Sequence, residues 1–260
     1  MKPFNYWNIE NFEISSYKHH LSDRYSKTYD TSGSDSTKKC VYTYNELGFR
    51  GDSIKKEGYK IMSIGCSFTE GVGVNDNETW PYQISNLMSA VNMNFGTGGR
   101  SNDFISRCLL TYFDLVNPDL VLIMYTYPHR REIYTKEGGI EPFIPGLRWG
   151  YISDTDEGNY VQELKERLQN VYEDYDNWYR NHLLIKNYLK VKKTPFVWNG
   201  SFLKIDNYEI PSEENRFDGD YDIFIDIGAD NNHPGQAHNK KYAENLFQFI
   251  KKNEISRKNI

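Results

Sequence analysis

The most constraining feature of the chain is the apolar segment Leu120-Val-Leu-Ile-Met-Tyr125, which follows a helix-breaking Asn117-Pro-Asp119. An apolar run without polar alternation is typical of a parallel strand that is buried on both faces. Lys60-Ile-Met-Ser-Ile-Gly65 has the same character in a shorter form. The sequence therefore predicts a sheet that is covered by helices on both sides.

Segments with helical spacing separate the expected strands. Val91–Phe95 and Thr194–Trp198 are two further strand candidates, and the intervals 80–90, 103–116, 161–190 and 237–251 are expected to be helical. Alternation of strand and helix predicts an α/β fold, a three-layer α/β/α sandwich with a central parallel sheet. The helix at 161–190 is expected to pack on that sheet through Leu164, Leu168, Tyr172, Tyr175 and Trp178/Tyr179.

The N-terminal part of the chain lacks this regular pattern. Residues 1–57 are polar and irregular, with a Ser- and Gly-rich loop at 31–39 and a short strand expected at 40–44. We predict that residues 1–57 form an extension packed on the core and that residues 58–260 form the main domain, with an insertion at 130–190. Within the insertion, residues 134–159 are expected to form a loop or lid.

Composition and charge limit the classes of partner. The formal charge of −5 over 260 residues gives no electrostatic basis for nucleic-acid binding. The three cysteines, Cys40, Cys66 and Cys108, lack metal-ligand spacing, so no metal and no cofactor are expected. No signal peptide or transmembrane segment is recognisable, and a cytoplasmic location is the expectation.

The first motif with candidate chemistry surrounds Ser67. This serine lies just beyond the strand at 60–65, in Gly65-Cys-Ser-Phe-Thr-Glu-Gly71, a turn that is expected to lead into a helix. Functional groups of parallel α/β folds lie at the carboxyl ends of the strands, and a helix N-terminus favours developing negative charge. The hydroxyl could equally serve as a helix cap, and this motif alone does not decide between the two roles.

The second motif is Asp230-Asn-Asn-His-Pro-Gly235, just before the final helix. A spacing of three allows one turn to hold the carboxylate of Asp230 against the imidazole of His233, which would fix the tautomer of a general base. Helix capping by Asp230 or Asn232 is the alternative. Because the motif follows the last expected strand, the catalytic interpretation is favoured, with His238 as the reserve base.

Together these motifs resemble the SGNH (GDSL-like) family of serine hydrolases. Gly65-Cys-Ser-Phe-Thr69 matches the Gly-Asp-Ser-x-Thr block of the family with Cys66 in place of Asp, and Asp230-x-x-His233-Pro matches its Asp-x-x-His-Pro block. Tyr44-Asn-Glu-Leu-Gly-Phe-Arg-Gly51 resembles an N-terminal element of one branch, which we interpret as a structural turn. The resemblance covers Tyr44 to the end, loosely between 134 and 190. It implies an SGNH/flavodoxin-like fold with Ser67, Asp230 and His233 as catalytic residues.

A glycine-rich stretch, Asn94-Phe-Gly-Thr-Gly-Gly-Arg-Ser-Asn102, lies where the family has Asn-x-Gly-x-x-Gly. The resemblance implies that the backbone N–H of Gly99 forms part of the oxyanion hole. A further block departs from the family, because Pro128 stands where an Asn side chain donates to the oxyanion. Loss of one such donor typically costs about 10² to 10³ in rate.

Three residues are candidates to replace that donor, and the sequence does not choose among Asn102, His129 and Arg130. Arg130 and Arg131 follow the carboxyl end of a strand and could instead bind an anionic group of the substrate. A surface or interdomain salt bridge is the alternative role for this arginine pair.

These features predict a serine esterase that hydrolyses acyl esters, acetyl esters on carbohydrates among them, through a Ser-His-Asp triad and an acyl-enzyme. The expected partner is a small-molecule or carbohydrate ester, with no nucleic acid and no membrane, and the oligomeric state is left open. An O-acyltransferase of the same fold and a non-catalytic binding module are the alternatives. The missing Asn favours the non-catalytic module, whereas Ser67, Asp230 and His233 oppose it.

Overall fold

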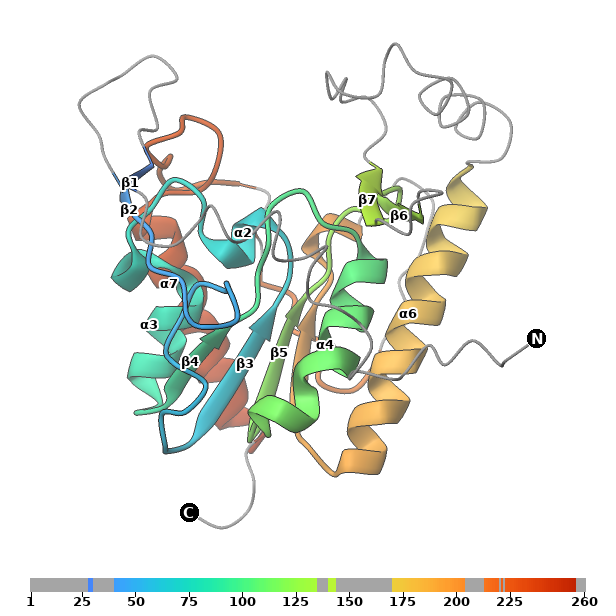
Figure 1. Ribbon diagram of the computed structural model, residues 1–260, viewed down its shortest axis with the longest axis horizontal. Helices are drawn as coiled ribbons and strands as arrows, with labels where there is room; N and C mark the ends of the chain where they lie inside the picture. Colours follow the sequence, from blue (N-terminus) through green and yellow to red (C-terminus); the bar gives the residue numbers. More distant parts are fainter. Residues whose placement is uncertain are drawn as a thin grey trace.

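The computed structural model describes residues 28–29, 40–134, 140–143, 170–203, 213–219, 221 and 223–255. Its centre is a four-stranded parallel sheet in the order β4-β3-β5-β8 (Figure 1). The strands are β3 (Lys60–Ile64), β4 (Val91–Asn94), β5 (Leu120–Met124) and β8 (Phe196–Asn199). The α/β fold with a central parallel sheet is therefore as predicted.

Strand register brings the carboxyl ends of the strands to one edge of the sheet. Ser63 of β3 pairs with Asn94 of β4, and Ile64 pairs with Ile123 of β5. On the other side of β5, Met124 pairs with Asn199 of β8. Residues that directly follow these strands are consequently neighbours, which is the placement that a site at this edge requires.

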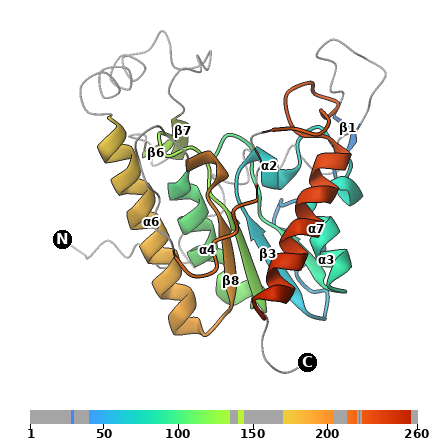
Figure 2. The same cartoon turned by 180° about the vertical axis from the view of Figure 1, so that it is seen from behind.

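Four helices cover the two faces of the sheet. Helices α4 (Asn102–Val116) and α6 (Val171–Lys192) lie on one face, and α3 (Trp80–Leu87) and α7 (Gln236–Lys252) lie on the other (Figures 1 and 2). The two helices of each pair also contact each other. This arrangement is the three-layer sandwich that alternation of strand and helix predicted.

The apolar run of β5 divides between the two faces. Val121 and Ile123 belong to the core beneath α4 and α6, whereas Leu120, Leu122 and Met124 belong to the core beneath α3 and α7. Successive side chains of a strand point to opposite faces, so a strand covered on both sides needs apolar residues at every position. Sheet burial thus accounts for the unbroken hydrophobic run.

Shorter elements complete the described chain. They are the paired strands β1 (Thr28–Tyr29) and β2 (Cys40–Val41), helix α2 (Ser67–Glu70), the hairpin β6 (Arg131–Tyr134) and β7 (Ile140–Phe143), and the 3₁₀ turns η2 (Asp76–Glu78) and η3 (Ser201–Leu203). No helix within the described ranges combines the length and apolar character that crossing a membrane requires.

Several local predictions need correction. The expected loop at 134–159 begins instead with the antiparallel hairpin of β6 and β7, and its remainder lies outside the described residues. In α6, Tyr175 and Trp178 are buried as predicted, but Tyr172, the second residue of the helix, is 74% exposed. Leu164 and Leu168 lie outside the described residues.

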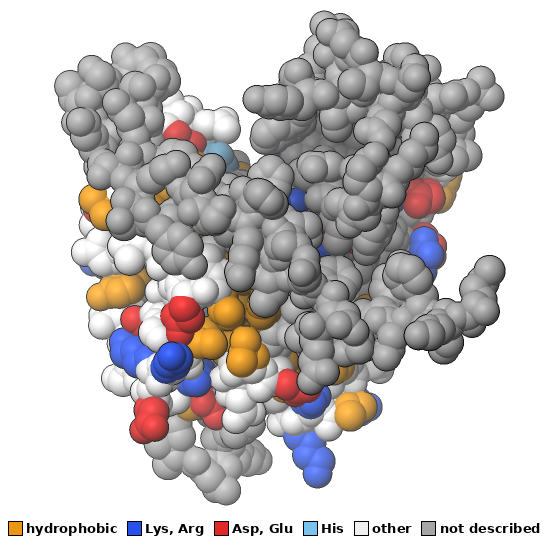
Figure 3. Space-filling view, viewed as in Figure 1, with side chains coloured by type: hydrophobic (Ala, Val, Ile, Leu, Met, Phe, Trp, Pro, Cys, Tyr) orange, Lys and Arg blue, Asp and Glu red, His pale blue; other side chains and the backbone are white. Residues whose placement is uncertain are grey.

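Charged side chains of both signs are interspersed on the described surface. Figure 3 shows Lys and Arg next to Asp and Glu over the lower half of the face seen there. The i, i+4 pairs Lys56–Asp52 and Arg180–Asp176 belong to this mixed surface. Such pairs on exposed side chains contribute about 0.3–0.5 kcal/mol each, so the fold depends on its apolar layers.

Candidate active site

Ser67 is the first residue of α2, and α2 begins two residues after the end of β3. Cys66, the N-cap residue, is fully buried, and Ser67 is 7% exposed. The first N–H groups of a helix have no acceptor within the helix, so the N–H of Ser67 is one of the unsatisfied donors at this end. The structure therefore places the hydroxyl and an N–H of Ser67 together at the carboxyl edge of the sheet.

Asp230 and His233 are in direct contact. Nδ1 of His233 lies 2.5 Å from Oδ2 of Asp230, and the backbone N–H of His233 donates to Oδ1 at 3.1 Å. Burial alone would raise the pKa of the Asp230 carboxyl, but hydrogen bonds from His233 and from the backbone of Asn232 outweigh it and lower that pKa. The carboxylate thus stays ionised at neutral pH and accepts from Nδ1, which leaves Nε2 as the basic nitrogen.

The loop that carries Asp230 and His233 is closed on itself. The N–H of Gly228 donates to the carbonyl of His233 at 2.7 Å, and Ile227 forms an antiparallel bridge with Pro234. Asp226 then caps the start of α7, accepting from the N–H groups of Ala237 and His238. This loop, residues 226–234, is therefore fixed at both of its ends.

Gly73 lies in the turn that follows α2 and contacts the loop of residues 226–234. Its carbonyl accepts from the N–H of Ala229 at 2.8 Å, and its N–H donates to the Tyr42 hydroxyl at 2.6 Å. Gly73 has φ +85°, and a Cβ there would lie 2.5 Å from Oδ1 of Asp230. Only glycine permits this approach, which packs the Asp230 carboxylate against the turn after α2.

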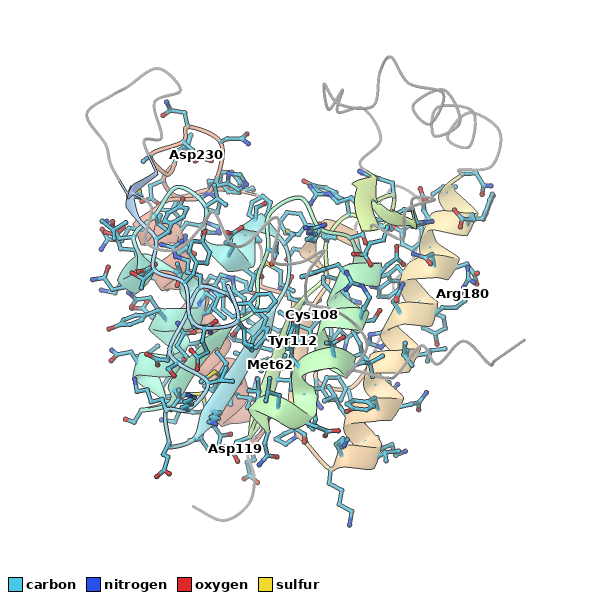
Figure 4. The ribbon with its side chains drawn as sticks, viewed as in Figure 1. Met62, Cys108, Tyr112, Asp119, Arg180 and Asp230 are labelled. Carbon is cyan, nitrogen blue, oxygen red and sulfur yellow. The ribbon has the colours of Figure 1, made fainter. Side chains whose placement is uncertain are left out.

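The imidazole of His233 packs on the residue next to Ser67. The ring centroids of Phe68 and His233 are 5.1 Å apart. Figure 4 shows Asp230 at the upper end of the molecule and Asp119, which precedes β5, at the opposite end. The carboxyl ends of the parallel strands therefore point toward the end of the molecule that carries Asp230.

The glycine loop, residues 96–99, approaches Ser67 from β4. A Cβ on Gly98 would lie 3.8 Å from Cβ of Ser67. The N–H of Gly98 donates to Oε2 of Glu70 at 2.6 Å, so this N–H is already occupied. The next residue, Gly99, has φ +72° and is the residue that the family resemblance implies for the oxyanion hole. That role stays a prediction.

Asn102, the other oxyanion candidate, is fully buried at the start of α4. Its Nδ2 donates to the carbonyl of Thr126 at 3.1 Å, and its Oδ1 accepts from the N–H of Thr126 at 3.0 Å. The amide therefore ties α4 to the segment that follows β5. One N–H of Nδ2 is committed to this contact, and a role of the second N–H at the oxyanion stays a prediction.

Arg130 and Arg131, which follow β5, have different interaction partners. Arg131 donates to Glu173 at 2.7 Å and to Asp174 at 2.8 Å, which is the salt-bridge role considered from the sequence. Arg130 instead lies with its guanidinium carbon 5.0 Å from the centroid of the Tyr127 ring. His129 stacks on Tyr127 at 5.4 Å, and its pKa is lowered by burial and by the two neighbouring arginines.

The other described histidines lie inside the protein. His238 is buried in α7, with its ring 4.5 Å from that of Tyr221, and His182 is buried in α6. His182 is also paired with a carboxylate, since its Nε2 lies 2.9 Å from Oε2 of Glu213, but its side chain is 1% exposed, whereas that of His233 is 16% exposed. Within the described ranges, His, Cys, Asp and Glu side chains form no group of three or more that could bind a metal ion.

Two buried charged residues near the site were not recognised from the sequence. Glu70 accepts from Gly98 and from the Tyr44 hydroxyl, and Arg50 donates to the carbonyls of Glu70, Gly71 and Val74. Glu70 lies one helical turn after Ser67, and this spacing is a signal that could have identified it. For Arg50, the structural role assumed for its motif agrees with these contacts.

Comparisons with known proteins were made once this geometry was established. No family model and no curated protein sequence matches the chain. Among solved structures, the chain is similar to a carbohydrate esterase family 2 enzyme with a carbohydrate-binding domain from Corynascus thermopiles (Myceliophthora fergusii), with 14% identity and a TM-score of 0.35. That alignment covers 77% of this chain and 68% of the other.

Two further structures are similar to the chain. One is a Desulfitobacterium hafniense protein described as belonging to the G-D-S-L family of lipolytic proteins, with 15% identity, a TM-score of 0.35, and coverage of 74% of this chain and 99% of the other. The other is a Clostridium thermocellum family 3 carbohydrate esterase, with 18% identity, a TM-score of 0.33, and coverage of 75% and 96%. All three are SGNH-type hydrolases, the family that the sequence motifs resemble.

Proposed function

We propose that this protein is a serine esterase that hydrolyses acyl esters through Ser67, His233 and Asp230. The observation that carries the proposal is the contact between Nδ1 of His233 and Oδ2 of Asp230, in a loop that packs on the turn after the Ser67 helix. The proposal rests on these residues of the chain and not on the similarity to solved structures.

The proposed reaction proceeds in two steps. The Ser67 hydroxyl attacks the ester carbonyl while Nε2 of His233 takes its proton, and the same proton then passes to the departing alcohol. Asp230 holds the tautomer of His233 and stabilises the imidazolium that forms. Water, activated by His233, then attacks the acyl-enzyme and releases the acid and free Ser67.

Oxyanion stabilisation is assigned to backbone groups. The N–H of Ser67 at the start of α2 and the N–H of Gly99 are the proposed donors, and the hydrogen bond from Gly98 to Glu70 supports the loop that carries Gly99. Because Pro128 offers no donor, the reaction is expected to be slower than with a complete set by about 10²-fold or more.

Carbohydrate esters are the proposed substrate class, with acetyl as the acyl group. Phe68 contacts the His233 ring directly, and the Phe224 ring lies 6.1 Å from Phe68, so aromatic surface borders the base. Aromatic faces stack on the apolar faces of sugar rings, which would hold an acetylated sugar beside the hydroxyl of Ser67.

A fluorophosphonate probe tests the nucleophile directly. The wild-type protein should be labelled at Ser67, Ser67→Ala should not be labelled, and Cys66→Ala should be labelled as the wild type is. In parallel, hydrolysis of p-nitrophenyl acetate should fall by about 10³- to 10⁴-fold in Asp230→Asn, in which the tautomer of His233 is no longer fixed.

The outcome of this experiment also separates the alternatives. Absence of labelling in a folded wild-type protein would exclude the triad and leave a binding module, which Pro128 and the engaged amide of Asn102 favour. Labelling with little hydrolysis, together with acetyl transfer to an added sugar, would identify an acyltransferase.

A further inference from the structure

Two nitrogens of the Arg130 guanidinium are buried without a hydrogen-bonding partner. Among the described residues, its Nε and Nη1 are both buried and make no hydrogen bond, while the residue as a whole is only half-buried. Burying guanidinium donors without an acceptor is costly, because their hydration is lost and nothing replaces it. Such a group is expected to meet an anion in the functional state of the protein.

Arg131, the adjacent residue, shows that acidic partners are available nearby. Its guanidinium donates to the carboxylates of Glu173 and Asp174 at the start of α6. Arg130 does not share these contacts, and the lowered pKa of His129 reflects burial first and then the two neighbouring positive charges. Arg130 is therefore a positively charged side chain whose Nε and Nη1 find no acceptor among the described residues.

An aromatic strip, formed by Phe68, Phe202 and Tyr127, connects this position to the catalytic imidazole. The ring centroids of Phe68 and Phe202 are 4.6 Å apart, and those of Phe202 and Tyr127 are 5.0 Å apart. His233 contacts the strip at Phe68, and Arg130 lies over Tyr127 at its other end.

We propose that Arg130 binds a carboxylate of the substrate, so that the esterase acts on acyl esters of acidic carbohydrates. The carboxylate would accept hydrogen bonds from the guanidinium, the geometry in which an arginine recognises a carboxylate most strongly. The sugar rings between the carboxylate and the ester would lie against Phe68 and Tyr127, because Phe202, which joins these two rings, is buried. This inference rests on the proposed function, since it places the scissile ester at Ser67.

A matched pair of substrates tests the inference. Hydrolysis of an acetylated oligogalacturonate is compared with that of the same oligosaccharide after reduction of its carboxyl groups to alcohols. The wild-type protein should have a kcat/KM at least 10-fold higher for the acidic substrate, through a lower KM. Arg130→Gln should lose this preference, so that its kcat/KM becomes the same for the acidic and the reduced substrate.

Controls distinguish the causes of failure. Arg180→Gln, which removes an exposed charge, should behave as the wild type does, and thermal unfolding verifies that each variant is folded. If the wild type hydrolyses p-nitrophenyl acetate but has no acidic preference, or if Arg130→Gln retains the preference, Arg130 does not bind the substrate and the esterase proposal stands. If no ester is hydrolysed, both proposals are wrong.

Discussion

The carboxylate of Glu70 accepts the backbone N–H of Gly98 at 2.6 Å, one helical turn after Ser67. The same carboxylate accepts the Tyr44 hydroxyl at 3.1 Å. Glu70 is buried, whereas the donors Tyr44 and Gly98 are half-buried. This contact couples α2, the helix that begins at Ser67, to the glycine loop, and we infer that Glu70 is a positioning residue for that loop.

Replacement of Glu70 by Ala should release the glycine loop. We expect kcat for p-nitrophenyl acetate to fall by about 10²-fold with little change in KM. The oxyanion donor on this loop stabilises the transition state and not the bound ester, so its displacement affects kcat alone. Two half-buried donors lose their acceptor, so the free energy of unfolding should also fall by about 1–3 kcal/mol.

The conservative variant Glu70→Gln separates positioning from charge. Its amide oxygen can accept from Gly98 and its NH₂ group can donate to the Tyr44 oxygen, so most of the activity should return. Steady-state kinetics and urea unfolding of both variants provide the measurements. Equal losses of kcat in the Ala and Gln variants would contradict a role limited to holding the loop.

Gly73 offers a way to move Asp230 without changing it. In Gly73→Ala, the new Cβ would lie 2.5 Å from Oδ1 of Asp230, and φ +85° would add strain of about 1–2 kcal/mol. The carboxylate must shift, so we expect kcat to fall at least 10-fold. Labelling by a fluorophosphonate should slow in parallel.

Gly58→Ala is the matched control for this experiment. Gly58 also has a positive φ, +127°, but a Cβ there meets only a methyl group of Val91 at 3.2 Å. The variant should be destabilised to a similar extent and keep its kcat. Loss of kcat in both variants would indicate that backbone strain, and not displacement of Asp230, causes the effect.

Much of the architecture could be predicted because it follows from local sequence. The apolar runs of β3 and β5 are local signals of a doubly covered sheet. The contact between Asp230 and His233 also joins residues three apart, and a single turn determines it. Both predictions depend only on residues that are close together in the sequence.

Contacts between segments that are distant in the sequence could not be predicted from it. The contact of Glu70 with Gly98 joins residues 28 apart, and that of Asn102 with Thr126 joins residues 24 apart. Each depends on how β3, β4 and β5 are ordered in the sheet, which periodicity does not determine. For the same reason, the sequence could not distinguish Arg131, which pairs with α6, from Arg130, which does not.

Arg50 should be among the most important residues for stability. Its side chain is 2% exposed and donates to Asp76 at 2.5 Å and to the carbonyls of Gly71 and Val74 at 2.6 Å each. A lysine cannot reach these acceptors together, because its ammonium group is a single point of contact. We therefore expect Arg50→Lys to lower the free energy of unfolding by about 3 kcal/mol.

Urea unfolding measures this loss, with Arg180→Lys as the control. Arg180 forms an exposed pair with Asp176, so its replacement should change the free energy of unfolding by less than about 0.5 kcal/mol. Arg50→Lys should also reduce esterase activity, since the turn that Arg50 holds carries Gly73. Stability equal to that of the wild type would show that the buried contacts of Arg50 are dispensable.

His182 should make the stability of the protein depend on pH. Its imidazole is 1% exposed, with Nδ1 3.0 Å from the Tyr125 hydroxyl and Nε2 2.9 Å from the Glu213 carboxylate. Burial lowers the pKa of His182, and the hydrogen bond and charge of Glu213 offset this only in part. The unfolded chain therefore binds a proton at a pH at which the folded protein does not.

The sign of the effect follows from this difference in proton binding. Stability contributed by neutral His182 is complete above the ordinary histidine pKa of about 6.5 and is lost as the pH falls below it. The urea midpoint of the wild type should therefore decrease from pH 7.5 to pH 5.5. In His182→Gln the decrease should be smaller but not absent, because the lowered pKa of His129 acts in the same direction. An identical decrease in both proteins would mean that His182 takes up a proton as readily in the folded state as in the unfolded chain. The Glu213 carboxylate would then have to compensate fully for the hydration that the buried imidazole loses.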